Sequence, residues 1–200
     1  MIDVNDILKL HETTVAQWHV AEIANCYEGF LRLVCRQHEQ NYRLWHQEDI
    51  ARSPDVGDTE IAAVKRAIDK LNQQRNDLIE QLDDGLLAEL AVAKVQPQAE
   101  ARQNTETPGS VIDRLSILAL RLYHMREQAA RSDASEEHRI KVLGRLEILC
   151  EQHRDLANGL QELLGDLFAG RKRLKLYRQF KMYNDPTMNP YLYAAKRSAA

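Results

Sequence analysis

The sequence predicts an all-α protein, an elongated antiparallel bundle of about five helices. Three observations lead to this class. The chain of 200 residues holds 26 Leu and 22 Ala but only 16 Val and Thr together, a bias that favours helices over strands. Its five prolines, at positions 54, 97, 108, 186 and 190, leave three long proline-free stretches. Within those stretches, apolar residues recur at helical spacing.

The first half of the chain predicts three helices. The second and third are separated only by a short turn that contains Pro54 and Gly57, so they should pack antiparallel. A polar, proline-containing loop should follow them. In chain order, the expected elements are helices over residues 3–18 and 21–52, a turn over 53–58, a helix over 59–95 and a loop over 96–106.

The fourth helix should begin near Pro108. Either Pro108 is its first residue behind Thr107, or Ser110 is its N-cap. The fifth should run over 133–170, from an acidic capping sequence to Gly170, a residue suited to the position after a helix. A basic helix to about residue 183 and a tail with Pro and Asn should complete the chain. The sequence therefore predicts one bundle domain over 1–183 and an extended tail over 184–200.

Charge and cysteine content narrow the class of protein. The net charge is −3 and the pI is about 6.2, so no nucleic-acid partner is expected. Neither a signal peptide nor a transmembrane segment is recognisable, which predicts a cytoplasmic location. Cys26 and Cys35, placed on one predicted helix, and Cys150 should be reduced thiols. Because elongated bundles expose apolar seams, we expect a homo-oligomer, with a dimer favoured.

Polar residues interrupt the core-facing stripes of three predicted helices. On a buried stripe such residues need partners, so we expect Glu48 and Arg75 to share one cluster with Arg114 or Arg121. The cluster is either a set of buried ion pairs that fixes helix register or a site for an anionic or polar ligand. Its candidate residues are Asn41, Trp45, Glu48, Asn72, Arg75, Asn76, Arg114, Arg121 and His124.

Histidines and acidic pairs give weaker indications. His11, His38, His124 and His153 lie on or beside core stripes, without metal-ligand spacing, and are expected to be hydrogen-bonded core residues. No metal or cofactor is therefore expected. An alternative is a Mg²⁺ site, because carboxylates one helical turn apart can hold Mg²⁺ against phosphate oxygens. Its ligands would be Glu48, Asp49, Glu80 and Asp83.

The C-terminal region concentrates positive charge. Residues 170–200 contain eight Lys or Arg and one Asp, although the whole chain is acidic. Either this segment docks on its own acidic bundle, or it forms a positive surface for an anionic partner. The anionic-partner candidates are Arg171, Lys172, Arg173, Lys175, Arg178 and Lys181.

Four segments of the chain resemble the bacterial domain-of-unknown-function 4254 family. They are NYRLWHQED at 41–49, IDKLNQQRNDLIE at 68–80, TPGSVIDRLS at 107–116 and YRQFKMYNDP at 177–186. The resemblance implies an all-helical bacterial protein and assigns no functional residue.

Two functions remain open at this level. The first is a non-catalytic binding or accessory module that uses the polar cluster or the basic C-terminal surface. The alternative is a Mg²⁺-dependent nucleotide or phosphate-ester hydrolase of the all-α pyrophosphohydrolase type, with Arg114 or Arg121 holding the phosphates. The second helix lacks the Glu-x-x-Glu pair of those enzymes, so the first function is favoured.

Overall fold

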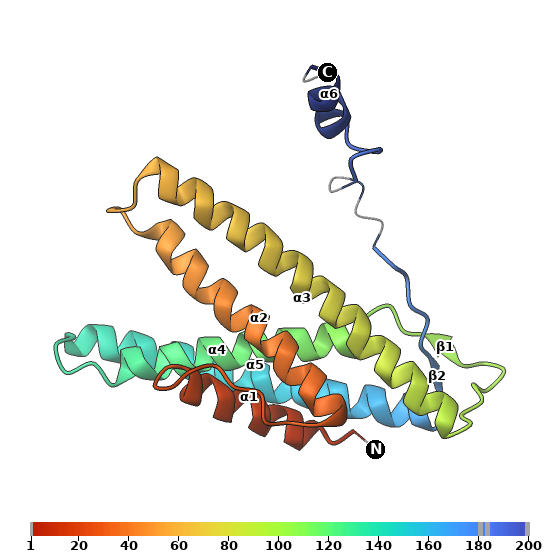
Figure 1. The fold of residues 1–200 in the computed structure, drawn as a ribbon. Coiled ribbons are helices and arrows are strands. Elements are labelled where there is room, and N and C mark those ends of the chain that lie inside the picture. Colours follow the sequence, from red (N-terminus) through yellow and green to blue (C-terminus); the bar gives the residue numbers. More distant parts are fainter. Residues whose placement is uncertain (1, 180–181, 183–184, 199–200) are drawn as a thin grey trace.

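The computed structural model describes residues 2–179, 182 and 185–198 and confirms the all-α class. Five long helices and a short sixth account for the fold (Figure 1). They are α1 (Val4–Trp18), α2 (Gly29–Arg52), α3 (Asp58–Val92), α4 (Pro108–Ala129), α5 (Glu136–Phe168) and α6 (Pro190–Ser198). Two short strands, β1 (Arg102–Gln103) and β2 (Lys172–Arg173), pair in parallel.

The long helices form two hairpins, α2–α3 and α4–α5, and α1 packs against both of them. The α2–α3 hairpin leans across the α4–α5 hairpin, and α1 lies against α2 and α4 (Figure 1). The far end of the α2–α3 hairpin projects away from the other helices (Figure 1). Among the described residues, each helix falls short of the apolar length that crossing a bilayer requires.

The capping residues confirm most predicted boundaries. Thr107 caps α4 through its hydroxyl, which accepts from the Ser110 amide at 3.2 Å, and Pro108 is the first helical residue. Ser135 caps α5 in the same way. Gly170 follows α5 with φ of +71°, in the left-handed region that a glycine adopts without strain.

The start of the second helix was predicted wrongly. Residues 21–28 form an irregular connection and α2 begins only at Gly29, whose φ of +54° breaks the helical path. The connection is held from both sides, because the Trp18 indole donates to the Ala24 carbonyl and the Tyr42 hydroxyl donates to the Trp18 carbonyl. Cys26 is therefore exposed in a loop, away from the helix that carries Cys35.

The C-terminal region also differs from its predicted form. Residues 174–179 are not helical, so the basic segment follows β2 as a strap. In the tail, residues 190–198 form α6, where an extended chain was expected.

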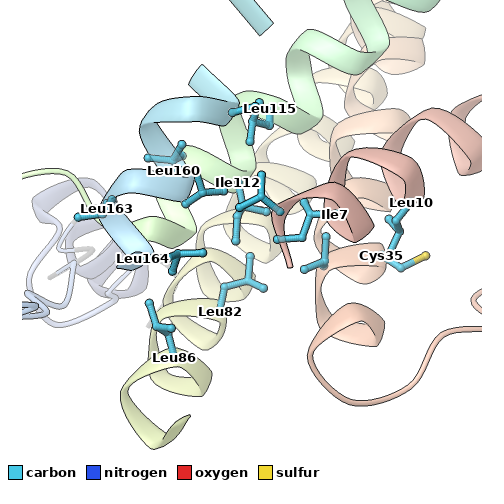
Figure 2. Packing of buried hydrophobic residues seen from close by; sticks show 14 of the residues in the cluster. Ile7, Leu10, Cys35, Leu82, Leu86, Ile112, Leu115, Leu160, Leu163 and Leu164 are labelled. Carbon is cyan, nitrogen blue, oxygen red and sulfur yellow. The ribbon is translucent and has the colours of Figure 1, made fainter. Parts of the chain in front are cut away.

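The core lies where α1, α3, α4 and α5 meet the first half of α2. Figure 2 shows leucines and isoleucines of these helices packed together, with Leu82, Leu115 and Leu160 at most 1% exposed. A separate small cluster of Leu44, Val64 and Ile68 lies farther along the α2–α3 hairpin.

Candidate functional site

A buried polar network joins α2, α3 and α4. Arg75 of α3 forms a two-point ion pair with Asp113 of α4, and its Nε lies 2.7 Å from Oδ1. The Gln37 and Asn41 amides of α2 donate to the same oxygen at 2.6 and 3.0 Å. The hydrogen bonds with Asp113 raise the pKa of Arg75, so the guanidinium remains charged. Every charge in the network is matched, which is typical of a structural cluster.

The network continues to one buried histidine, His38, and a second, His11, packs against its ring. The Ser116 hydroxyl accepts from the Asn41 amide at 2.9 Å and lies 2.6 Å from Nδ1 of His38. His38 stacks between Trp18 and His11, with ring centres 5.2 and 4.6 Å away. Burial lowers the pKa of His38 to about 3 and the pKa of His11 well below its usual range. Both imidazoles are therefore neutral at physiological pH.

The predicted partnership of Glu48 and Arg75 does not form. Glu48 pairs with Arg52 on its own helix at 2.9 Å, and Arg114 pairs with Glu106 at 2.6 Å. Asp113, one position before Arg114, takes the predicted place of Glu48. Because Glu48 lies near the turn of the α2–α3 hairpin, it reaches the start of α3 and not its middle.

Two neighbouring hollows lie against α4 and α5, and Arg121 and Gln152 line both of them. The first, of about 490 Å³, is lined by Trp45, Arg121, His124, Met125, Gln128, Arg145, Ile148, Leu149 and Gln152. The second, of about 680 Å³, is lined by Arg114, Ile117, Leu118, Arg121, Gln152, Asp155 and Leu156.

The first hollow combines an aromatic wall with free positive charge. The Trp45 ring stacks on His124 with ring centres 4.7 Å apart and an interplanar angle of 11°. Within the described part of the chain, neither Arg121 nor Arg145 forms an ion pair. Guanidinium groups bind carboxylate and phosphate groups with two parallel hydrogen bonds. Three of the predicted candidates, Trp45, Arg121 and His124, thus meet here.

A cluster of imidazoles adjoins this wall and was missed in the sequence. His19, His46 and His124 come from the end of α1, from α2 and from α4, and their ring centres lie 5.1 to 6.1 Å apart. Tyr42 and Tyr123 pack on the same rings. The available signal was an aromatic residue directly before each histidine, in Trp18-His19, Trp45-His46 and Tyr123-His124.

The acidic residues of the Mg²⁺ alternative do not come together as a set. Glu80 and Asp83 line a hollow of about 140 Å³ with Asn76, between α3, α4 and the strap. The Asp83 carboxylate accepts from the Gly109 amide at 2.7 Å at the start of α4, and burial raises the pKa of Asp83. Glu48 and Asp49 lie on α2 outside this hollow. Within the described chain, no three His, Cys, Asp or Glu side chains have an arrangement that could hold a metal ion.

Close contacts at Gly109 fix how α3 and α4 meet. A Cβ atom at this position would lie 2.7 Å from the Ile79 carbonyl oxygen and 2.8 Å from the Asp83 carboxylate. Glycine therefore lets the start of α4 approach α3 closely enough for the Asp83 hydrogen bond. The remaining candidate, Asn72, lies half-buried on α3 outside the two α4–α5 hollows.

The basic segment is largely paired with the bundle itself. Arg178 reaches Glu80 and Asp84 at 3.1 and 2.6 Å, and Arg171 and Lys172 both reach Asp166. Arg173 donates to the carbonyls of residues 98 and 99, and Lys175 lies over the Tyr177 ring. Lys181 lies outside the described residues. The contacts favour the docking alternative over a free positive surface.

Comparison with known proteins gives a family and no activity. The model of the family described as "Protein of unknown function (DUF4254)" matches residues 31–176, which include the polar network and the lining of both α4–α5 hollows. No curated protein and no solved structure matches the chain. The chain belongs to the DUF4254 family.

Proposed function

We propose that this protein is a non-catalytic binding module for a small anionic ligand that also has an apolar part. The observation that carries the proposal is a pair of guanidiniums, Arg121 and Arg145, that form no ion pair with any described residue. They line a hollow that also holds apolar side chains and the Trp45–His124 stack. The guanidiniums would hold the carboxylate, sulfonate or phosphate of the ligand, and Met125 and Ile148 would cover its apolar part.

The second hollow is the less suitable place for the negative charge. It contains the Asp155 carboxylate, and its Arg114 already pairs with Glu106. Because Arg121 borders both hollows, a longer ligand would extend its neutral portion into the second one. The proposal also includes a cytoplasmic location in a bacterium and a homodimeric state. Light scattering of the purified chain would test the homodimer.

Binding is tested with the probe 8-anilinonaphthalene-1-sulfonate, a small aromatic anion, and with its neutral relative N-phenyl-1-naphthylamine. In a Trp18→Phe background, Trp45 emission reports occupancy of the first hollow. Replacing both arginines, Arg121→Gln and Arg145→Gln, should weaken binding of the anionic probe by at least about tenfold, since even one lost hydrogen bond to a charged group costs about 1.5 kcal/mol. The neutral probe should be little affected.

The matched control is Arg139→Gln, which removes an arginine of α5 that already pairs with Glu136 outside both hollows. This control should bind both probes as the parent does. Equal affinity of the double variant and the control for the anionic probe would contradict the proposed site.

Metal-dependent hydrolysis is the second candidate, supported by the placement of Glu80 and Asp83 in one hollow. Both carboxylates already have partners in the bundle and the strap, which makes this candidate weaker. A nucleotide screen with Mg²⁺ or Mn²⁺ tests it. Turnover that Glu80→Gln abolishes would promote the hydrolase over the binding module.

A further inference from the structure

Helix α5 has an outer face that the other described helices leave exposed. It packs mainly on α4, with smaller contacts to α1 and β2. On its outer side, residues spaced three or four positions apart lie on one face of the helix. These residues form the α5 stripe, and all of them are exposed: Lys141, Gly144, Arg145, Ile148, Glu151, Gln152 and Asp155. The centre of the stripe is apolar, since Ile148 is 56% exposed there.

The four charges of the α5 stripe have no ionic partner. Lys141 and Arg145 lie on one side of Ile148, and Glu151 and Asp155 lie on the other. None of these four side chains forms an ion pair within the described chain. Within each half, two like charges stand four positions apart, which destabilises a helix by itself. A single copy of the chain therefore gains nothing from this charge pattern.

The α5 stripe is complementary to a second copy of itself. Lys141 and Asp155 lie seven positions before and after Ile148. Arg145 and Glu151 lie three positions before and after it. When two copies of α5 pack antiparallel about a two-fold axis at Ile148, Lys141 meets Asp155 of the partner subunit. In the same arrangement, Arg145 meets Glu151 of the partner subunit, and each contact occurs twice.

We propose that this protein forms a homodimer through an antiparallel, two-fold symmetric contact between the α5 stripes of two copies, with Ile148 at the axis. Helices that cross at about 20° stay close over several turns. The stripe from residue 141 to residue 155 is about 21 Å long at 1.5 Å per residue. A Cβ atom on Gly144 would meet nothing within 4 Å, so the partner has room to approach here.

The proposed function includes a homodimer, and this inference rests on that part of it. The stripe also borders the two α4–α5 hollows, because Arg145 and Ile148 line the first and Asp155 lines the second. The partner subunit would therefore border both hollows. Arg145 would serve both roles, since a guanidinium has five N–H donors, enough for Glu151 of the partner subunit and for a ligand anion.

Sedimentation velocity of the ligand-free protein over a dilution series measures the dissociation constant of the dimer. Lys141→Glu and Asp155→Lys each turn two attractions per dimer into repulsions, so each should weaken the dimer at least about tenfold. The double variant should restore the parent dimer, because opposite charges again meet. Residues 141 and 155 lie about 21 Å apart on one helix, so this rescue requires two molecules.

Two controls match these variants in charge. Arg154→Glu makes the same charge change as Lys141→Glu about 100° around the helix from Asp155, and it should leave the dimer unchanged. Glu162→Lys in the Lys141→Glu background restores the net charge, but residue 162 lies seven positions beyond residue 155 and faces no stripe charge of the partner. It should therefore not restore the dimer. All the substituted residues are exposed, and circular dichroism checks that the variants are folded.

Cross-linking at the two-fold axis gives a second readout. Ile148→Cys, in a background with Cys26→Ser and Cys150→Ser, places two thiols opposite each other. Oxidation with copper phenanthroline should then join two chains by a disulfide. Ile140→Cys is the control, because Ile140 is 63% exposed on the same helix. The two copies of residue 140 would lie about 24 Å apart in the antiparallel pair and should not be joined.

The results separate the interface from the other parts of the proposed function. A parent protein that is monomeric at about 100 µM would overturn both the homodimer and the α5 interface. A dimer that Lys141→Glu leaves unchanged, or that the double variant does not restore, would overturn the α5 interface alone. Failure of 8-anilinonaphthalene-1-sulfonate to bind contradicts only the ligand site, because the sedimentation is measured without ligand.

Discussion

Replacing Asp113 by alanine is the sharpest test of the buried network. Asp113 accepts from Gln37 and Asn41 and pairs at two points with Arg75. The substitution removes an acceptor from the Arg75 guanidinium and from the Gln37 and Asn41 amides, of which Asn41 still donates to Ser116. Breaking a buried ion pair by removing one partner costs about 3–5 kcal/mol. The Arg75 side chain is 25% exposed and can regain some hydration, so we expect the lower end, about 3 kcal/mol.

Urea unfolding followed by circular dichroism measures this loss, and the midpoint should fall at an unchanged slope. In a thermal scan, about 3 kcal/mol corresponds to about 6–12 °C for a chain of this size. Arg75→Met in the Asp113→Ala background should restore part of the loss, because it removes the uncompensated charge.

The matched control is Asp69→Ala. Asp69 pairs with Lys65 across one turn of α3, with both side chains more than 60% exposed, and such surface pairs contribute at most about 0.5 kcal/mol. A loss at Asp113 below about 1 kcal/mol, or no larger than that at Asp69, would refute the view that the network is buried and matched.

Three further predictions concern packing, acid stability and the strap. Gly109→Ala should lower the thermal midpoint by an amount equivalent to about 1–3 kcal/mol, since its Cβ would meet the Ile79 carbonyl at 2.7 Å; an unchanged midpoint would show that α4 shifts freely. Stability should fall as pH drops below about 6.5, because the unfolded chain binds a proton at His38 that the fold, with a pKa of about 3, does not. For His38 alone, the free energy of unfolding should fall by about 1.4 kcal/mol per pH unit, or by about 2 kcal/mol in total at pH 5. Urea titrations at several pH values measure this fall. An equally steep pH dependence in His38→Gln would contradict this origin. Arg178→Gln should release the strap from Glu80 and speed hydrogen exchange at residues 176–179, with little change in global stability; unchanged exchange there would mean that other contacts hold the strap.

The helices could be predicted because their signals are local. Thr107 and Pro108 mark a helix start by their own chemistry, and the structure uses them as in one of the two predicted alternatives. The predicted acidic capping sequence lies at the start of α5, where the cap is Ser135 and the helix begins at Glu136, three residues later than predicted. Residues 21–28 were misassigned because their composition suits a helix, whereas the chain must turn there to bring α2 back against α1. The Trp18 and Tyr42 hydrogen bonds that hold this turn depend on distant residues.

The partners within the polar network could not be read from the sequence in the same way. Helical phase placed Arg75 toward the core correctly, but the choice between Glu48 and Asp113 depends on the stagger and rotation of neighbouring helices. The imidazole cluster has the same difficulty, since residues 19, 46 and 124 meet only after three helices have packed. A single aromatic–His dipeptide carries no information about its surroundings. Only the recurrence of this dipeptide on three helices indicates that the three histidines share an environment.

The two ends of the α2–α3 hairpin differ in how many of their side chains are buried. Its base contributes to the main core, but its projecting end is held by a separate cluster with only Leu44, Val64 and Ile68 buried (Figure 1). Three buried side chains contribute far less burial than the main core, so the projecting end should open without unfolding the rest. We therefore expect a rigid base that carries a hinged arm, with the amides of residues 44–71 exchanging with solvent through openings that leave α4 and α5 closed.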